Sequence, residues 1–189
     1  ERQSELLFCV LSGAVRELSQ AKAVLVGGHT TNGEELSIGF TVFGRTQNAV
    51  NAGLPMSKAN LRSGQMLILT KAVGTGVILA ANDSGFTAAR AMSAAIDMML
   101  QSNQRAGEIA SESGVTAATD ITGFGLAGHL LEMCQQSGVT VELNVASVSL
   151  IKGAAELIQA GVRSSLHVEN AANVQDWMSC SDGPGAPEC

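Results

Sequence analysis

The segment Thr119 to His129, TDITGFGLAGH, constrains the fold of this chain most strongly, because it joins an apolar run to a helical pattern through closely spaced glycines. Val115 to Ala118 is typical of a short strand, and Leu126, Leu130 and Met133 recur at the spacing of a helix face. Glycine lets a ligand approach the backbone, and the amides at a helix start attract anions. The segment therefore predicts a strand-to-helix junction that can bind a phosphate group.

Asp120 adds a carboxylate to this junction, and its hard oxygen ligands are suited to Mg²⁺. Thr119, Thr122 and Gly123 are candidates to support a bound phosphate through their hydroxyl and amide groups. In a plainer interpretation, Thr119 or Thr122 only caps the helix and the glycines only permit a tight turn. This motif alone leaves both interpretations open.

A second glycine-rich turn, Gly27 to Thr30, follows the apolar run Ala23 to Val26. Its amides and the Thr30 hydroxyl can hold phosphate oxygens, although the Walker and Rossmann glycine spacings are absent. His29 has an ordinary interpretation as a turn residue bonded to the backbone and a functional one as a nucleotide contact. The turn is a second candidate for phosphate binding.

The other cationic and imidazole side chains give weaker signals. Lys71 follows the apolar run Met66 to Thr70 and is a candidate phosphate contact, but a lysine at a strand end is more often a solvated charge. His129 and His167 are expected to be structural or exposed, because no carboxylate or cysteine stands at zinc-ligand spacing. No hydrolase nucleophile motif or Cys/His catalytic arrangement occurs, so we assign no catalytic residue in this chain.

The composition excludes some partners. The chain of 189 residues has a net charge of −6, and its eleven lysines and arginines are scattered, which argues against nucleic acid. No apolar run approaches the ~18 residues of a membrane span. The start of the sequence has no export signal and the four cysteines have no metal spacing, so we expect a cytoplasmic, reduced protein.

Helical and strand patterns alternate along the chain, with an aperiodic break from Arg45 to Ser63. Before the break, the pattern predicts a helix that ends before Ala21 and strands over 23–26 and 36–42. After the break, it predicts a buried strand over 66–70 and further strands over 115–118 and 139–145. It predicts helices over 74–82, 88–101, 107–113, 126–133 and 150–160. The chain becomes polar near its end, so we predict two domains, 1–45 and 46–170, and a disordered tail over 171–189.

Four motifs in a fixed order, VGGHTTNGEELSIGF, LTKAVGTG, MLQSN and TDITGFGLAGHLLEM, resemble the selenophosphate synthetase (selenide, water dikinase) family. The resemblance runs from about Leu6 to about Asn170. Four ordered motifs are far more specific than one glycine-rich loop. Within the wider superfamily of aminoimidazole-ribonucleotide synthetase, the TDITGFG signature points to the selenium enzyme.

The resemblance implies an α/β fold in which helices flank a mixed sheet. Residues 46–170 would be the C-terminal domain of the aminoimidazole-ribonucleotide synthetase-like fold, and residues 1–45 a remnant of the N-terminal ATP-binding domain. The implied activity forms selenophosphate from selenide, ATP and water, with release of AMP and phosphate, in a Mg²⁺-dependent homodimer. The implied site residues are Asp120 as a metal ligand and Gly27, Gly28, His29 and Thr30 as ATP contacts.

The sequence also departs from the family pattern. The reactive cysteine or selenocysteine, the nearby lysine and several aspartate ligands of the family have no counterpart here, so we expect this chain alone to be inactive. The end of the chain, from Ser179 to Cys189, does not match either. Two alternatives stay open: a non-catalytic nucleotide-binding or dimerisation module of the same fold, and another small-molecule kinase or ligase of the superfamily.

Overall fold

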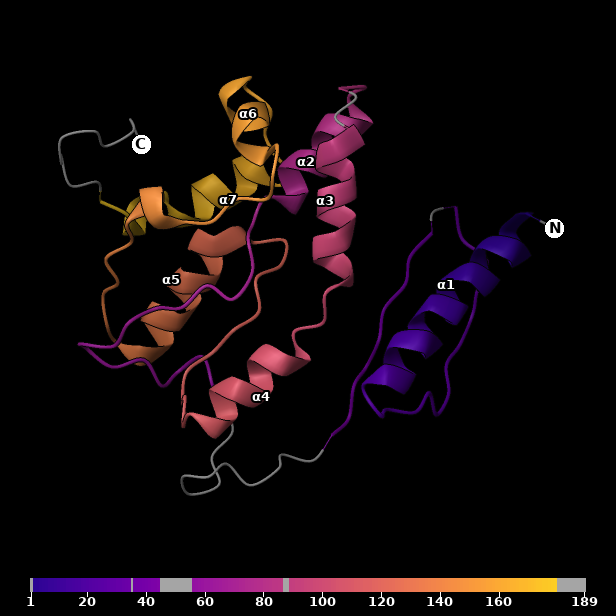
Figure 1. Cartoon of the computed structure of the whole chain (residues 1–189), viewed down its shortest axis with the longest axis horizontal. Coiled ribbons are helices and arrows are strands. Elements are labelled where there is room, and N and C mark those ends of the chain that lie inside the picture. The colour runs from indigo at the N-terminus through magenta and orange to yellow at the C-terminus, as the bar shows by residue number, and fades with distance from the viewer. Residues whose placement is uncertain (1, 35, 45–55, 87–88, 180–189) are drawn as a thin grey trace. The chain divides into compact units, whose positions relative to one another are not determined.

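The computed structural model describes residues 2–34, 36–44, 56–86 and 89–179. The chain divides into two compact units, residues 1–45 and 46–189, which we describe separately (Figure 1). Helices are the main regular elements of both units. None of the helices in these ranges combines the length and the apolar character that a bilayer crossing requires.

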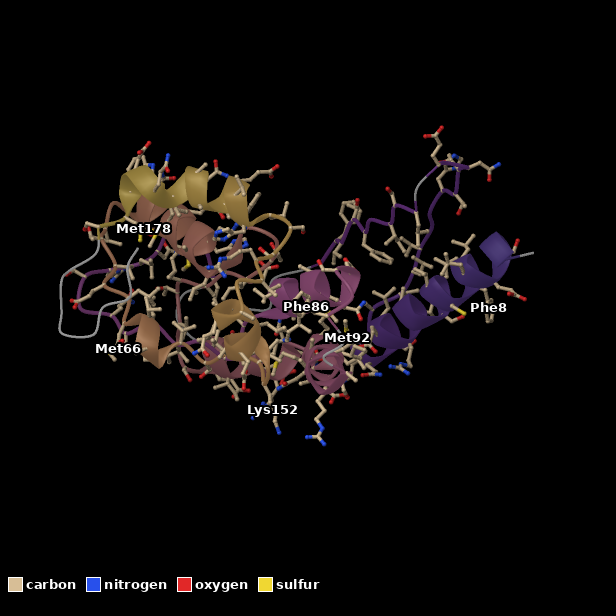
Figure 2. All side chains as sticks on the ribbon, turned by 90° about the horizontal axis from the view of Figure 1, so that it is seen from above. Phe8, Met66, Phe86, Met92, Lys152 and Met178 are labelled. Carbon is tan, nitrogen blue, oxygen red and sulfur yellow. The ribbon has the colours of Figure 1, made fainter. Side chains whose placement is uncertain are left out.

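The first unit contains one long helix and two further segments. Helix α1 spans Arg2–Gln20, which confirms the predicted helix that ends before Ala21. One face of α1 is half-buried, and Phe8, labelled in Figure 2, is 72% exposed. The half-buried residues recur at helical spacing: Leu7, Val10, Ala14 and Leu18. The described residues of the segments 23–34 and 36–44 have exposed side chains throughout, so this unit holds no buried core in its described part.

The core of the second unit lies among three helices. These helices are α2 (Thr75–Asp83), α3 (Ala89–Leu100) and α6 (Ala154–Gln159), and α2 packs against the other two. Ile78 of α2 is the largest side chain that is fully buried in the described residues, at 1% exposure. Most of its buried neighbours are alanines, which let helix backbones approach closely. The other buried members are Ala81, Ala91, Ala95, Ile151, Ala154 and Leu157.

Two glycines make this close approach possible. Gly74 (φ 126°) precedes α2 and Gly153 (φ 91°) precedes α6, and both backbone conformations disfavour other residues. A Cβ on Gly153 would lie 2.6 Å from the Cβ of Ala91, and one on Gly74 would lie 2.8 Å from the Cβ of Ala154. Helix α6 begins directly after Gly153, which is later than the predicted start at residue 150.

The remaining helices form the other part of this unit. They are α4 (Gln104–Glu112), α5 (Gly125–Ser137) and α7 (His167–Val174), with the short 3₁₀ helices η1 (Val145–Ser147) and η2 (Gln175–Trp177). Helices α5 and α7 lie side by side (Figure 1). The pattern predicted α4 and α5 but missed α7.

The prediction of a disordered tail from residue 171 is wrong for the residues that the structure describes. Helix α7 continues to Val174 and η2 follows it directly. Val174 is the one buried residue of α7, at 8% exposure. This polar helix therefore packs through a single apolar side chain and lacks the continuous apolar face of an amphipathic helix. The last part of the predicted tail, 180–189, lies outside the described residues.

The predicted mixed sheet is not seen in the described parts of the chain. Two isolated parallel bridges take its place, Ser57 to Ala117 and Val73 to Leu150. The segments predicted as strands over 23–26, 36–42, 66–70, 115–118 and 139–145 form no ladder within the described residues. A strand needs hydrogen-bonded neighbours and a covered face, and apolar alternation alone supplies neither.

The segment 66–69 illustrates this difference, because it was predicted to be a buried strand. Met66 and Ile68 are 87% and 82% exposed, whereas Leu67 and Leu69 are 40% and 36% exposed. This period of two is typical of a strand with one covered face. The alternation is therefore present, but the predicted burial is wrong for the described chain.

Candidate functional site

The turn that precedes α5 brings Asp120 and Thr122 to the start of that helix. The Thr122 carbonyl accepts a hydrogen bond from the Gly125 amide at 3.0 Å, and Gly125 has a φ of 69°. The N-cap residue of α5 is Phe124, and no side chain of the described residues makes a capping hydrogen bond there. The plainer interpretation, in which Thr119 or Thr122 caps this helix, is therefore wrong.

Asp120 is exposed at this turn. Its main-chain carbonyl accepts a hydrogen bond from the Thr119 hydroxyl at 3.1 Å. Its carboxylate has no hydrogen bond or ion pair within the described ranges. Both oxygens are therefore available to a cation, and the nearby helix start adds amides that favour an anion.

His129, in the second turn of α5, reaches back to the same turn. The Thr122 amide donates a hydrogen bond to Nε2 of His129 at 3.1 Å, and the Thr122 hydroxyl oxygen lies 3.0 Å from the same nitrogen. His129 is 4% exposed, whereas His167 is exposed. The two histidines that the sequence grouped together therefore have different environments.

Glu132, one turn further along α5, links His129 to a distant segment. Its Oε2 atom lies 2.7 Å from Nζ of Lys58 and 3.7 Å from Nδ1 of His129. The second distance is too long for a hydrogen bond, and Nδ1 is buried without a hydrogen-bond partner among the described residues. Ser137 strengthens the attachment of Lys58, because its hydroxyl donates to the Lys58 carbonyl at 3.2 Å. Lys58 is thus tied to α5 through both its side chain and its backbone.

Helix α7 holds the turn from the other side. The Asn170 side chain donates a hydrogen bond to the Gly123 carbonyl at 2.8 Å. A Cβ on Gly123 would lie 3.1 Å from Cδ1 of Leu166, so a larger residue would press against that side chain. The contact is with the end of a flexible side chain that is 40% exposed, so a small residue at position 123 would require a shift of Leu166 by a few tenths of an ångström.

These contacts surround a hollow of about 450 Å³ between α5, α7 and the segment that carries Lys58. Two carboxylates, one ammonium group and one imidazole contribute to its wall, together with apolar carbons. The lining residues are Lys58, Asp120, Thr122, Phe124, Gly128, His129, Leu131, Glu132, Asn170, Asn173 and Val174. We refer to this hollow as the α5–α7 pocket.

The predicted site residues fall into three places. Asp120 and Thr122 line the α5–α7 pocket, and Thr119 and Gly123 adjoin it in the same turn. Lys71 lies elsewhere, where its Nζ donates to the carbonyls of Met98 at 3.2 Å and Gln101 at 2.8 Å. Lys71 thus binds the end of α3, a favourable position for a cation, and its role as a phosphate contact stays a prediction.

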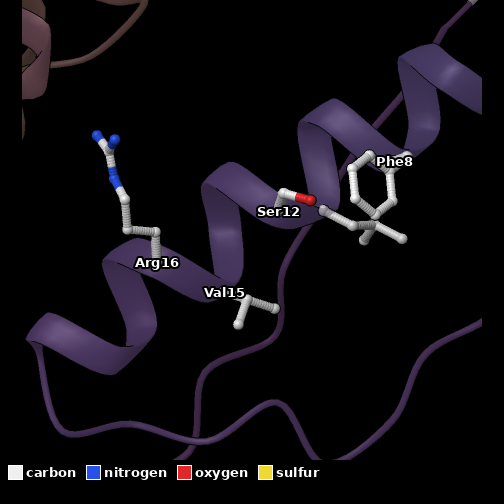
Figure 3. Close-up of a pocket in the computed structure, with 5 residues that line it drawn as sticks. Phe8, Ser12, Val15 and Arg16 are labelled. Atoms are coloured by element: carbon white, nitrogen blue, oxygen red, sulfur yellow. The ribbon is translucent and has the colours of Figure 1, made fainter.

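The second predicted turn belongs to the first unit. Gly27, Gly28, His29 and Thr30 are all exposed there. Their role in binding ATP stays a prediction, since the two units are described separately. The first unit also has a hollow of about 430 Å³, but all its lining residues come from α1 (Figure 3). They are Phe8, Leu11, Ser12, Val15 and Arg16, which together offer a mainly apolar helix face rather than converging polar groups.

A metal ion needs more ligands than this part of the chain brings together. No group of three or more His, Cys, Asp or Glu side chains that could hold a metal is found among the described residues. Asp120 supplies one suitable oxygen donor, and Glu132 is already paired with Lys58. The described residues therefore do not fit a complete Mg²⁺ site by themselves.

The comparison with known families assigns the domain that carries the pocket. Residues 62–172, more than half of the chain, match the family described as AIR synthase related protein, C-terminal domain. The chain belongs to this family. The matched range includes the Asp120 turn, His129 and Asn170, whereas Lys58 precedes it.

Curated relatives define the group within the family more narrowly. A selenide, water dikinase of Caldanaerobacter subterraneus subsp. tengcongensis is 40% identical over 158 residues, which are 84% of this chain and 45% of the relative. One from Geobacter metallireducens is 33% identical over 181 residues, 96% of this chain and 52% of the relative. One from Clostridioides difficile is 35% identical over 158 residues, 84% of this chain and 44% of the relative. The resemblance to selenophosphate synthetases is confirmed, and the chain spans about half the length of these relatives.

Sequence reasoning missed several residues of the pocket. Glu132 follows His129 by three residues, so their position on one helix face was a usable signal. Asn170 had only the general signal of a polar residue in a helix. Lys58 had none, because it is 74 residues away from Glu132 and lies in an aperiodic segment.

Proposed function

We propose that this chain is the C-terminal part of a selenide, water dikinase, an enzyme that forms selenophosphate from selenide, ATP and water and releases AMP and phosphate. The observation that carries the proposal is the similarity to enzymes of this name over 84% to 96% of the chain. The exposed Asp120 carboxylate, which has no hydrogen bond or ion pair with any described residue, supports it, because phosphoryl transfer depends on positioned charge.

We also propose Mg²⁺ as the metal and Asp120 as one of its ligands. Nucleotide phosphates and carboxylates outside the described residues would complete the coordination shell. Gly27, Gly28, His29 and Thr30 would contact ATP, in a homodimer, with Thr119, Thr122 and Gly123 supporting the phosphate groups. A mixed sheet would form where the apolar segments that have no ladder within the described residues find neighbouring strands.

Calorimetry of Mg²⁺-ATP binding to the full-length protein that contains this chain tests the proposal. We expect Asp120→Asn to weaken binding by roughly tenfold or more, because the substitution removes the ligand charge. Asp97→Asn is the matched control, since Asp97 is exposed on α3 and lines no part of the α5–α7 pocket. Equal binding by the two variants would contradict a metal role for Asp120.

A product assay tests the reaction itself. The full-length protein should release AMP from ATP only when selenide is present. AMP release that requires a different small molecule would favour another kinase or ligase of the superfamily. Nucleotide binding without turnover would favour a non-catalytic module.

A further inference from the structure

We propose that His129 is a positioning residue, whose Nε2 atom fixes the turn of residues 120–123 from within α5. Two polar groups of Thr122 converge on this one nitrogen, at 3.1 Å for the amide and 3.0 Å for the hydroxyl. Asp120 is two residues away in the same turn. By holding Thr122, His129 limits the positions that the Asp120 carboxylate can take at the α5–α7 pocket. The consequence for ligand binding rests on the proposed function.

The hydrogen bond from Thr122 fixes the tautomer of His129. A backbone amide can only donate, so Nε2 must be the unprotonated acceptor, and the neutral ring carries its proton on Nδ1. That nitrogen is buried and lies 3.7 Å from Oε2 of Glu132, whose negative charge favours an N–H on this side. Lys58 holds Glu132 through its 2.7 Å ion pair. Glu132 therefore acts on His129 through its nearby charge alone, since no hydrogen bond joins the two side chains.

An apolar residue of similar size at position 129 would keep the packing but remove the acceptor. The Thr122 amide would then lose its acceptor, and because Thr122 is itself exposed, water would reach the amide and its protection from exchange would fall. Asn170 would still hold Gly123 from α7. The turn would thus stay attached on one side and lose its attachment to α5, which predicts local mobility rather than loss of the fold.

Nuclear magnetic resonance on this chain tests the contact without any ligand. A long-range proton–nitrogen spectrum should show Nε2 of His129 as the unprotonated nitrogen. In His129→Leu, amide exchange of Thr122 should accelerate by roughly tenfold or more. In His129→Gln, whose side-chain oxygen can replace Nε2 as acceptor, exchange should stay within about threefold of the parent chain. A proton on Nε2, or unchanged exchange in His129→Leu, would overturn the proposal.

His167→Leu is the matched control, because it makes the same substitution at an exposed histidine of α7. It should leave the exchange of the Thr122 amide unchanged. An acceleration as large as in His129→Leu would show that any loss of imidazole in this unit loosens the turn, and would contradict the specific contact. If His129→Leu fails to fold, the parent spectrum and His129→Gln still decide the outcome.

Mg²⁺-ATP calorimetry on the full-length protein tests the consequence for the ligand. His129→Leu should raise Kd by roughly tenfold or more, and His129→Gln should restore binding to within about threefold. If Asp120→Asn leaves Kd unchanged while the resonance results are as expected, the proposed metal role fails and the positioning of the turn stands. If Asp120→Asn weakens binding and His129→Leu does not, His129 is not a positioning residue for this site.

Discussion

The two units of the chain contain similar apolar sequence but use it differently. In the described part of the first unit no side chain is buried, and Val26 and Val42 are 91% and 80% exposed. In the second unit, Ile78 and the alanines around it form a core in which exposure falls to 1% or less for several residues. A helix needs only a local pattern, but a core needs segments that are distant in sequence to meet. The second unit has such partners within the chain.

The largest expected change in the free energy of unfolding comes from replacing a buried isoleucine of the second unit, and an exposed isoleucine of the first unit is its counterpart. Ile78→Ala should lower the free energy of unfolding by about 4 kcal/mol, because it leaves a cavity among three packed helices. Ile38→Ala, at a residue that is 53% exposed, should change it by less than about 0.5 kcal/mol. Urea unfolding followed by circular dichroism measures both. A comparable loss in Ile38→Ala would mean that the first unit packs this segment in solution.

Gly153 and Gly161 have nearly equal φ angles, but only Gly153 is crowded by a neighbouring atom. Alanine substitutions at the two positions therefore distinguish the cost of steric crowding from the cost of backbone strain. Gly153→Ala should cost about 3 kcal/mol, since its Cβ would lie 2.6 Å from the Cβ of Ala91 and its φ is 91°. Gly161→Ala has a φ of 87° and no atom within 4 Å of the new Cβ, so strain alone should cost about 1 kcal/mol. Thermal or urea unfolding gives the difference. Equal costs would show that α3 and α6 are not closely packed.

Helix α7 extends into the region that was predicted to be a disordered tail, and a pair of valine variants tests whether this helix is docked. Val174→Ala should destabilise the second unit by about 2 kcal/mol, because the 8% exposed side chain loses buried carbon next to α5. Val168→Ala, at 78% exposure on the same helix, should have an effect below about 0.5 kcal/mol. The same unfolding measurement applies. If the two valines behave alike, α7 is not docked in solution.

The smallest expected effect is a difference in alkylation rate between one cysteine of each unit, Cys9 in the first and Cys134 in the second. Burial raises the pKa of the Cys134 thiol on α5, and its hydrogen bond with the Val141 backbone only partly opposes this shift. A raised pKa lowers the thiolate fraction near pH 8, so Cys134 should react more slowly than the exposed Cys9. Peptide mapping after brief iodoacetamide treatment measures the two rates. Faster alkylation of Cys134 would contradict its partial burial.

Local periodicity predicted most of the helices, whereas the segments predicted as strands form no sheet within the described residues. The stripe in α1 and the apolar positions of α5 repeat at helical spacing, so those helices followed from the sequence. Residues 66–70 were predicted to be a buried strand because they form an apolar run, but strand pairing depends on neighbours that the described chain provides only at two bridges. Helix α7 was missed because Val174 is its only buried residue, too weak a signal for an amphipathic pattern.

The candidate site was predictable where its residues are adjacent in sequence. Asp120 and Thr122 share one motif, and the structure places both in the wall of one pocket. His129 belongs to the same motif, but the geometry of its ring, which decides its contacts, is set by the turn of the backbone. Lys58 reaches the site through tertiary packing alone, and no spacing rule connects it to Glu132.

The position of Lys71 also bears on how the second unit acquires its structure. Its bond to the Gln101 carbonyl closes a segment of 30 residues that contains α2 and α3, whereas the bridge from Val73 to Leu150 closes a far longer one. Closing a short loop loses less chain entropy and is completed earlier. We therefore expect α2 and α3 to pack together before α6 joins them.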